Sequence, residues 1–230
     1  MTYSPFNEMT HAWIAAQFYK ELTERCGEPG KALFIHATQY YASTRGRRMA
    51  LRALRDGKEL TYAVYQEYGE WASSPEMIDK GEENRSEITE WSPDLTMKIT
   101  QCPWHTQFKK MGMTEAGSVY CAHLDNSICR GFNPYLVYEV PQTLHKSDCC
   151  IQIVRNACFA EGENHPKHPE YIRPFEYHCA HLYWAMAEVS GTVYGNDAAD
   201  AVLAAMRETY GDEAAETILG YRNVNFHVID

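Results

Sequence analysis

An alternation of apolar and polar residues near the middle of the chain constrains the fold more than any other feature. Over residues 95–100 every second side chain is apolar, which predicts a strand with one buried face. The strand should end near Cys102, because Pro103 cannot donate a hydrogen bond to a neighbouring strand. The elements expected after it are a short helix over 105–111, a helix over 117–130, and two strands over 136–140 and 149–154. This order predicts a small antiparallel sheet with the longer helix packed against it.

Helical patterns flank this block on both sides, so the expected fold class is α+β. Three regions follow: an N-terminal helical region over 1–72, an α+β core over 90–158 that carries the site, and a C-terminal helical cap over 170–230, all within one compact domain. Residues 73–90 are expected to form a loop or flap. In the N-terminal region we expect one helix from Thr10 to Gly27, one from Pro29 to Gly46 and one over 60–71. In the C-terminal region we expect helices over 174–190, 197–210 and 211–220.

Composition disfavours nucleic-acid and membrane partners and indicates the cellular compartment. The 230 residues carry a formal net charge of −10, which disfavours a nucleic-acid or anionic membrane surface. No apolar run reaches the ~20 residues that a transmembrane helix needs, and the N-terminal residues are polar. A cytoplasmic location is therefore expected, where the eight cysteines remain thiols. We expect a small-molecule ligand and no cofactor, and the sequence is compatible with a homo-oligomer.

The helix over 117–130 carries the strongest candidates for chemistry. An apolar ridge that includes Tyr120 runs beside a second ridge formed by Cys121, Asp125 and Cys129, each four residues apart. A cysteine is a nucleophile as the thiolate, and a position near a helix N-terminus favours that form. Asp125 would raise the thiol pKa unless it binds a cationic substrate or orients a histidine. We therefore expect Cys121 to act as a nucleophile on a cationic substrate that Asp125 binds; the alternative is that Cys121 is an inert buried cysteine.

Several motifs of this block resemble one family. They are Cys102-Pro103-Trp104, Cys121 with Asp125, Gly131-Phe132-Asn133-Pro134, and Asp148 with Cys150. Together they are similar to the L-2-amino-thiazoline-4-carboxylic acid hydrolase family over about residues 90–157. The resemblance implies hydrolytic opening of a small ring that contains sulfur and nitrogen. On that basis Cys121 would attack a ring carbon while Asp125 holds the ring nitrogen. The resemblance supports the reaction class, hydrolysis of a small ring, more firmly than it supports a thiazoline as the substrate.

Six further residues are candidates for contact with the substrate. They are Trp104, Tyr120, Phe132, Asn133, Cys150 and His178. Trp104, Tyr120 and Phe132 are suited to line a pocket for a planar ring, and core packing is the alternative. Asn133 would serve as a polar positioning group or bond its own backbone within a turn. Cys150, on the strand face opposite Ile151, is suited to meet Cys121 across the pocket, and plain packing is the alternative.

Three other interpretations stay open at the level of mechanism. Asp125 could act as a general base on water, without covalent chemistry. His178 and His181 could hold a metal, although an isolated His-x-x-His is weak support, and we assign no metal ligand. The arginines at positions 45, 47, 48, 52 and 55 are expected to form a solvated face or to pair across subunits; the alternative is an anchor for a substrate carboxylate.

The function that the sequence favours is an enzyme, a hydrolase that opens a cyclic amide, amidine or thiazoline at a carbon–nitrogen bond. One rival is a hydrolase or isomerase of another small ring, such as a lactam or a cyclic diketone, with or without a metal. The other rival is a non-enzymatic module that binds a small ligand.

Overall fold

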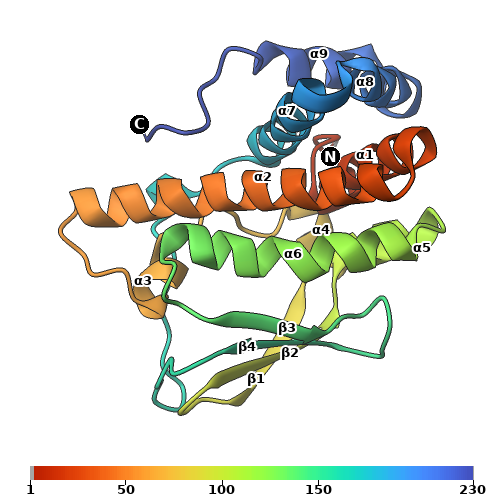
Figure 1. Ribbon diagram of the computed structural model, residues 1–230. Helices are drawn as coiled ribbons and strands as arrows, with labels where there is room; N and C mark the ends of the chain where they lie inside the picture. Colours follow the sequence, from red (N-terminus) through yellow and green to blue (C-terminus); the bar gives the residue numbers. More distant parts are fainter. Residues whose placement is uncertain (1–2, 230) are drawn as a thin grey trace.

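The computed structural model of the protein describes residues 3–229, which combine long helices with a four-stranded antiparallel sheet (Figure 1). The fold class is therefore α+β, as the order of elements in the sequence predicts. In chain order the elements are α1 (Glu8–Cys26), α2 (Glu28–Arg55), α3 (Tyr62–Glu67), α4 (Pro75–Lys80), β1 (Arg85–Glu90), β2 (Leu95–Gln101), α5 (Pro103–Lys110), α6 (Thr114–Phe132), β3 (Tyr138–Gln142), β4 (Cys150–Val154), a 3₁₀ turn (Pro169–Tyr171), α7 (Phe175–Tyr194), α8 (Asp197–Tyr210) and α9 (Asp212–Gly220).

The N-cap of helix α1 lies three residues before Thr10, the cap that the sequence suggested. The side chain of Asn7 accepts hydrogen bonds from the backbone N–H groups of Met9 and Thr10, so Asn7 is the N-cap and Thr10 lies inside the helix. The helix ends at Gly27, whose φ of 59° is a left-handed conformation that glycine adopts without strain.

The sequence predicts that the second helix ends near Gly46, but helix α2 continues to Arg55. A Cβ atom on Gly46 would collide with the backbone of Ile128 in α6, and one on Gly131 would lie 2.7 Å from Cα of Ser43 in α2. Both glycines therefore permit two long helices to cross at close range. Gly131 is therefore a crossing residue and not the end of α6, which continues to Phe132.

The strands are ordered β1-β2-β4-β3, and all neighbours are antiparallel. Strands β2, β3 and β4 lie close to the positions that alternation predicts. The expectation of a loop or flap over 73–90 is wrong, because this segment forms α4 and β1. Strand β1 is an edge strand with mostly exposed side chains on both faces, so its sequence lacks the alternation that marks a half-buried strand.

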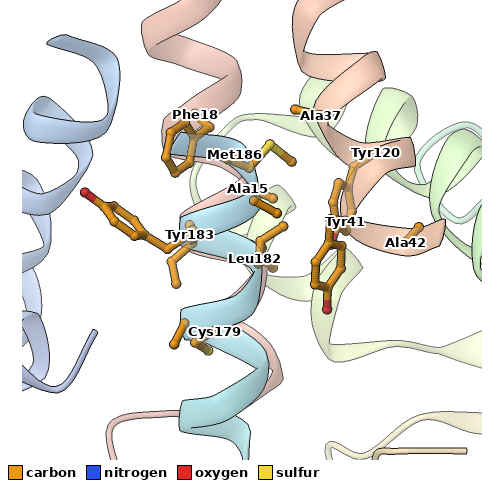
Figure 2. Close-up of a cluster of buried hydrophobic side chains, with 14 of the residues drawn as sticks. Ala15, Phe18, Ala37, Tyr41, Ala42, Tyr120, Cys179, Leu182, Tyr183 and Met186 are labelled. Carbon is orange, nitrogen blue, oxygen red and sulfur yellow. The ribbon is translucent and has the colours of Figure 1, made fainter. Parts of the chain in front are cut away.

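Helix α6 lies along one face of the sheet, α2 lies on α6, and α7 to α9 lie beyond α2 (Figure 1). One hydrophobic core runs through the helical layers from Phe6 to Phe226, so all three regions of the chain contribute to it. A smaller cluster packs Leu95 of β2 and Val154 of β4 against Cys129 of α6. Figure 2 shows part of the larger core, where Leu182 and Met186 of α7 lie between residues of α1 and α2. The site described below forms where the larger core meets the sheet.

No helix within residues 3–229 combines the length and the apolar composition that a membrane crossing requires.

Candidate active site

A cavity of about 250 Å³ lies between α6 and the inner face of the sheet. Strands β2 and β4 pair so that Ile99 lies opposite Cys150 and Met97 opposite Gln152, and all four side chains line this cavity. Helices α1, α2 and α7 close one end of it with His11, Arg45 and His178, among others. The volume is below the range of about 300–1,000 Å³ that is usual for drug-sized ligands, so the cavity suits a small molecule.

Cys121 and Asp125 lie one turn apart on α6, and both side chains line the cavity. Gln152 Nε2 donates a hydrogen bond to Asp125 Oδ2 at 3.0 Å, and the Tyr138 hydroxyl donates to Gln152 Oε1 at 2.6 Å. The tyrosine fixes the orientation of the amide, and the amide in turn fixes the carboxylate. Burial raises the pKa of Asp125 to about 6, although Arg45 and the Gln152 hydrogen bond lower it.

Cys121 is a protonated thiol rather than a resting thiolate. Burial, and then the neighbouring Cys102, Asp125 and Cys150, raise its pKa well above the ordinary value. Helix α6 begins at Thr114, so Cys121 lies about two turns from the helix N-terminus and gains little from the dipole, contrary to expectation. Cys121 Sγ instead lies 3.5 Å from Nε2 of His145, in the loop between β3 and β4.

The arginines of α2 are mostly not a solvated face, which corrects the expectation for Arg45, Arg48 and Arg52. These three are at most 8% exposed and surround the buried carboxylate of Glu70. Arg48 donates to Glu70 through Nε (3.0 Å) and Nη2 (2.7 Å), and Arg52 Nη1 donates at 2.6 Å. Burial alone would raise the pKa of Glu70, but the arginines outweigh it and lower that pKa to about 2.

Arg45 is the member of this cluster that lines the cavity. Its Nε atom lies 3.8 Å from Glu70 Oε2 and has no hydrogen-bond partner among residues 3–229. The Glu70 carboxylate thus faces three guanidinium groups, and Arg45 also interacts with Asp125 across the cavity wall. A buried donor of this kind costs free energy unless a ligand or water accepts its hydrogen bond.

Three more buried polar atoms of cavity residues have no partner within the described part of the chain: the Tyr120 hydroxyl, Thr143 Oγ1 and His178 Nδ1. His178 Nε2 donates to the backbone oxygen of Glu70 at 3.1 Å, and burial lowers the pKa of His178 to about 3. The ring is therefore neutral, and its Nδ1 is a hydrogen-bond acceptor. Together these atoms can bind a compact polar ligand that both donates and accepts.

The structure brings together six of the eight residues that the sequence singled out: Trp104, Tyr120, Cys121, Asp125, Cys150 and His178 all line the cavity. Trp104 is fixed there because its Nε1 donates to Nδ1 of His11 at 3.0 Å, and His11 Nε2 is 3.0 Å from the Tyr41 hydroxyl. Their roles toward a substrate stay predictions.

Phe132 and Asn133 lie outside the cavity wall. The Phe132 ring is buried and packs edge-on against Tyr65, at 5.6 Å between centroids. Asn133 Nδ2 donates to the backbone oxygen of Leu60, and its Oδ1 accepts from the N–H of Tyr135. These contacts correspond to the packing and turn alternatives, because Asn133 follows the last residue of α6 where the chain turns toward β3.

His178 and His181 have separate environments. His178 faces the cavity, whereas His181 stacks on Phe226 at 4.6 Å between centroids and lies 3.4 Å from Arg48 Nη2 through its Nδ1. Within residues 3–229, no three His, Cys, Asp or Glu side chains are grouped so that they could share a metal ion.

Sequence reasoning did not identify His145, Gln152 or His11 as parts of the site. His145 lies in a loop without periodicity, and only its place between the Cys121 and Cys150 motifs links it to them. Gln152 offered a usable signal, since it follows Cys150 by two residues and therefore shares its strand face.

The fold and the cavity define an α+β protein with a small pocket whose wall includes a thiol and a carboxylate one helical turn apart. The sequence profile of the L-2-amino-thiazoline-4-carboxylic acid hydrolase family matches residues 7–152. The chain belongs to that family, whose name implies hydrolase activity. The match extends from α1 to β4 and so includes nearly the whole cavity wall, except for α7. Comparisons with curated proteins and with solved structures gave no match.

Proposed function

We propose that the protein is a hydrolase that opens a small ring at a carbon–nitrogen bond, and that the ring carries a carboxylate. The observation that carries the proposal is the set of buried polar atoms without partners around one small cavity. Family membership supports the reaction class. The substrates expected are cyclic amides, amidines or thiazolines.

Arg45 is the anchor for the substrate carboxylate. Within residues 3–229 its Nε donor has no hydrogen-bond partner, and its positive charge is only partly balanced, because Glu70 also pairs with Arg48 and Arg52. Both features favour an anion at this end of the cavity. Asp125 binds the ring nitrogen from the α6 side. A ring with an acidic substituent and a protonated nitrogen matches both groups, which is the opposite-charge arrangement that fixes orientation.

Cys121 is the nucleophile in this proposal, and its sulfur attacks the ring carbon bonded to the nitrogen that leaves. The alternative assigns Asp125 as the general base for a water molecule. A carboxyl pKa of about 6 suits that role, because a general base works best when its pKa is near the operating pH. The two mechanisms differ in whether a covalent enzyme intermediate forms.

The test is turnover of a panel of five- and six-membered rings, each with and without a carboxylate. The expected result is hydrolysis that requires the carboxylate, releases a new amine, and is lost in Cys121→Ser but kept in the exposed control Cys158→Ser. A trapped adduct on Cys121 supports the covalent mechanism. Release of a thiol without an amine from a thiazoline would contradict the assignment to a carbon–nitrogen bond. Absence of turnover across the panel would contradict the hydrolase itself.

A further inference from the structure

We propose that His145 accepts the proton of Cys121 during the attack and that His105 is the positioning residue that orients His145. This inference rests on the proposed function, because it supplies the base that a protonated cysteine nucleophile needs. Nε2 of His145 lies 3.5 Å from Cys121 Sγ, and both residues line the cavity. Hydrogen-bonding distances between a nucleophile and its base are often this long before substrate binds.

Gly117 makes the contact between His145 and α6 possible. It lies one turn before Cys121, and a Cβ atom there would be 2.7 Å from Nε2 and 2.8 Å from Nδ1 of His145. Any other residue at position 117 would therefore displace the imidazole from the helix. Phe108 holds the ring from another side in an edge-on contact, at 5.6 Å between centroids.

His105 sets the proton arrangement on His145. The Nδ1 atoms of the two rings are 3.3 Å apart, so one of them donates a hydrogen bond to the other. When His145 is the donor, its Nδ1 carries the hydrogen and its Nε2 is left with a lone pair directed at Cys121. The same hydrogen bond stabilises His145 after it accepts a second proton at Nε2.

The surroundings of the pair disfavour a thiolate–imidazolium pair before the attack, so the proton moves only as sulfur bonds to carbon. Burial, and then His105, lower the pKa of His145 to about 4, while burial raises that of Cys121. Thiol and imidazole are thus both neutral at pH 7. Asp125, the other candidate base, lies one turn further along α6, and one of its oxygens already accepts from Gln152.

The reaction sequence balances as the addition of one water molecule. Sγ forms a bond to the ring carbon, its proton moves to His145 Nε2, and the electron pair of the C=O or C=N bond moves to the heteroatom. A lone pair on the oxygen, or on the exocyclic nitrogen of a thiazoline, then forms a double bond to the carbon as the ring C–N bond breaks, and the leaving nitrogen takes the proton from His145. A thiazoline nitrogen already carries the other proton that it needs, because it binds to Asp125 in its protonated form. Water attacks the carbon attached to sulfur and gives one proton to His145, which returns it to sulfur as the S–C bond breaks.

The test is the rate at which iodoacetamide alkylates Cys121, measured by mass spectrometry of its peptide, which needs no substrate. We expect His145→Gln and Gly117→Ala to slow this alkylation by at least about tenfold, and to lower turnover by about 100-fold or more, the range for loss of a general base. His123→Gln is the matched control, because His123 lies on the same helix, is half-buried and does not line the cavity.

Two other cysteines in the same sample report on the fold. Exposed Cys158 should label equally in every variant, and buried Cys179 should stay unlabelled. Unchanged alkylation of Cys121 in both variants would overturn the assignment of His145, even if rings are hydrolysed. Alkylation that depends on His145 in a protein that turns over no ring would support the pair and contradict only the hydrolase.

Discussion

Asp125 illustrates at the scale of one residue how a site group can reduce stability. An aspartate in the unfolded chain releases its proton near pH 3.8, whereas burial moves the pKa of Asp125 to about 6. Between these values the folded state binds more protons than the unfolded state, so the folded state loses stability as pH rises through this window. We predict that Asp125→Asn raises the free energy of unfolding at pH 8 by on the order of 2 kcal/mol, with a smaller gain at pH 4.5. Urea unfolding at the two pH values measures this difference.

The same substitution should abolish turnover, because asparagine cannot bind a cationic ring nitrogen or act as a base. In the unsubstituted protein, activity should rise with pH through about 6, and Arg45→Met should shift this rise to higher pH, since Arg45 lowers the Asp125 pKa. Asp212→Asn, at the exposed start of α9 and away from the cavity, is the matched control and should leave both properties nearly unchanged. A loss of stability in Asp125→Asn at pH 8 would mean that the carboxylate stabilises the fold instead.

At the scale of secondary-structure elements, the crossing of α2 and α6 sets the position of the site. Asp125 and Arg45 face one cavity only because glycines 46 and 131 let these helices approach closely. We predict that Gly131→Ala destabilises the protein by about 1–3 kcal/mol, the usual cost of overpacking, because its new methyl group would meet the backbone of Ser43. It should also raise KM, since separation of the helices moves Arg45 relative to Asp125.

Gly220→Ala is the control for this prediction. Position 220 is the last residue of α9, and a Cβ atom there would meet no atom within 4 Å. The expected result is unchanged KM and a stability that is equal or up to about 1 kcal/mol higher, because alanine is the better helix former. Chemical unfolding and steady-state kinetics on both variants separate the two outcomes; equal behaviour of the pair would show that the crossing has no special role.

Elements whose signal is local could be predicted from sequence, and elements set by tertiary contacts could not. Strand β2 follows from its alternation, and the Cys121–Asp125 ridge follows from helical spacing. Gly46 was misread as a helix end because a glycine that stops a helix and one that permits a close crossing look alike in sequence. The buried arginines were misread for a similar reason, because their partner Glu70 is brought to them only by the fold.

At the scale of the whole molecule, the cavity requires segments from α1 to α7. The family match ends at residue 152, yet α7 contributes His178 and Phe175 to the wall. Helix α7 is held on α1 and α2 by the main core, with α8 and α9 packed on its other side. Helices α8 and α9 therefore support the site by positioning α7, and none of their residues lines the cavity.

This arrangement predicts different effects for two histidines of α7 that are each 1% exposed. His178→Phe removes the unpartnered Nδ1 acceptor of a residue that lines the cavity, so KM should rise by about 3- to 10-fold, the value of one hydrogen bond. His181→Phe, one turn later, keeps a ring against Phe226 but lies outside the cavity wall, so it should change stability without changing KM. The test is to measure KM of both variants by steady-state kinetics at a temperature well below each variant's Tm, where both are folded. A rise in KM for both variants would indicate that α7 acts by general rigidity, whereas a rise for His178→Phe alone would assign substrate contact to a helix beyond the family match.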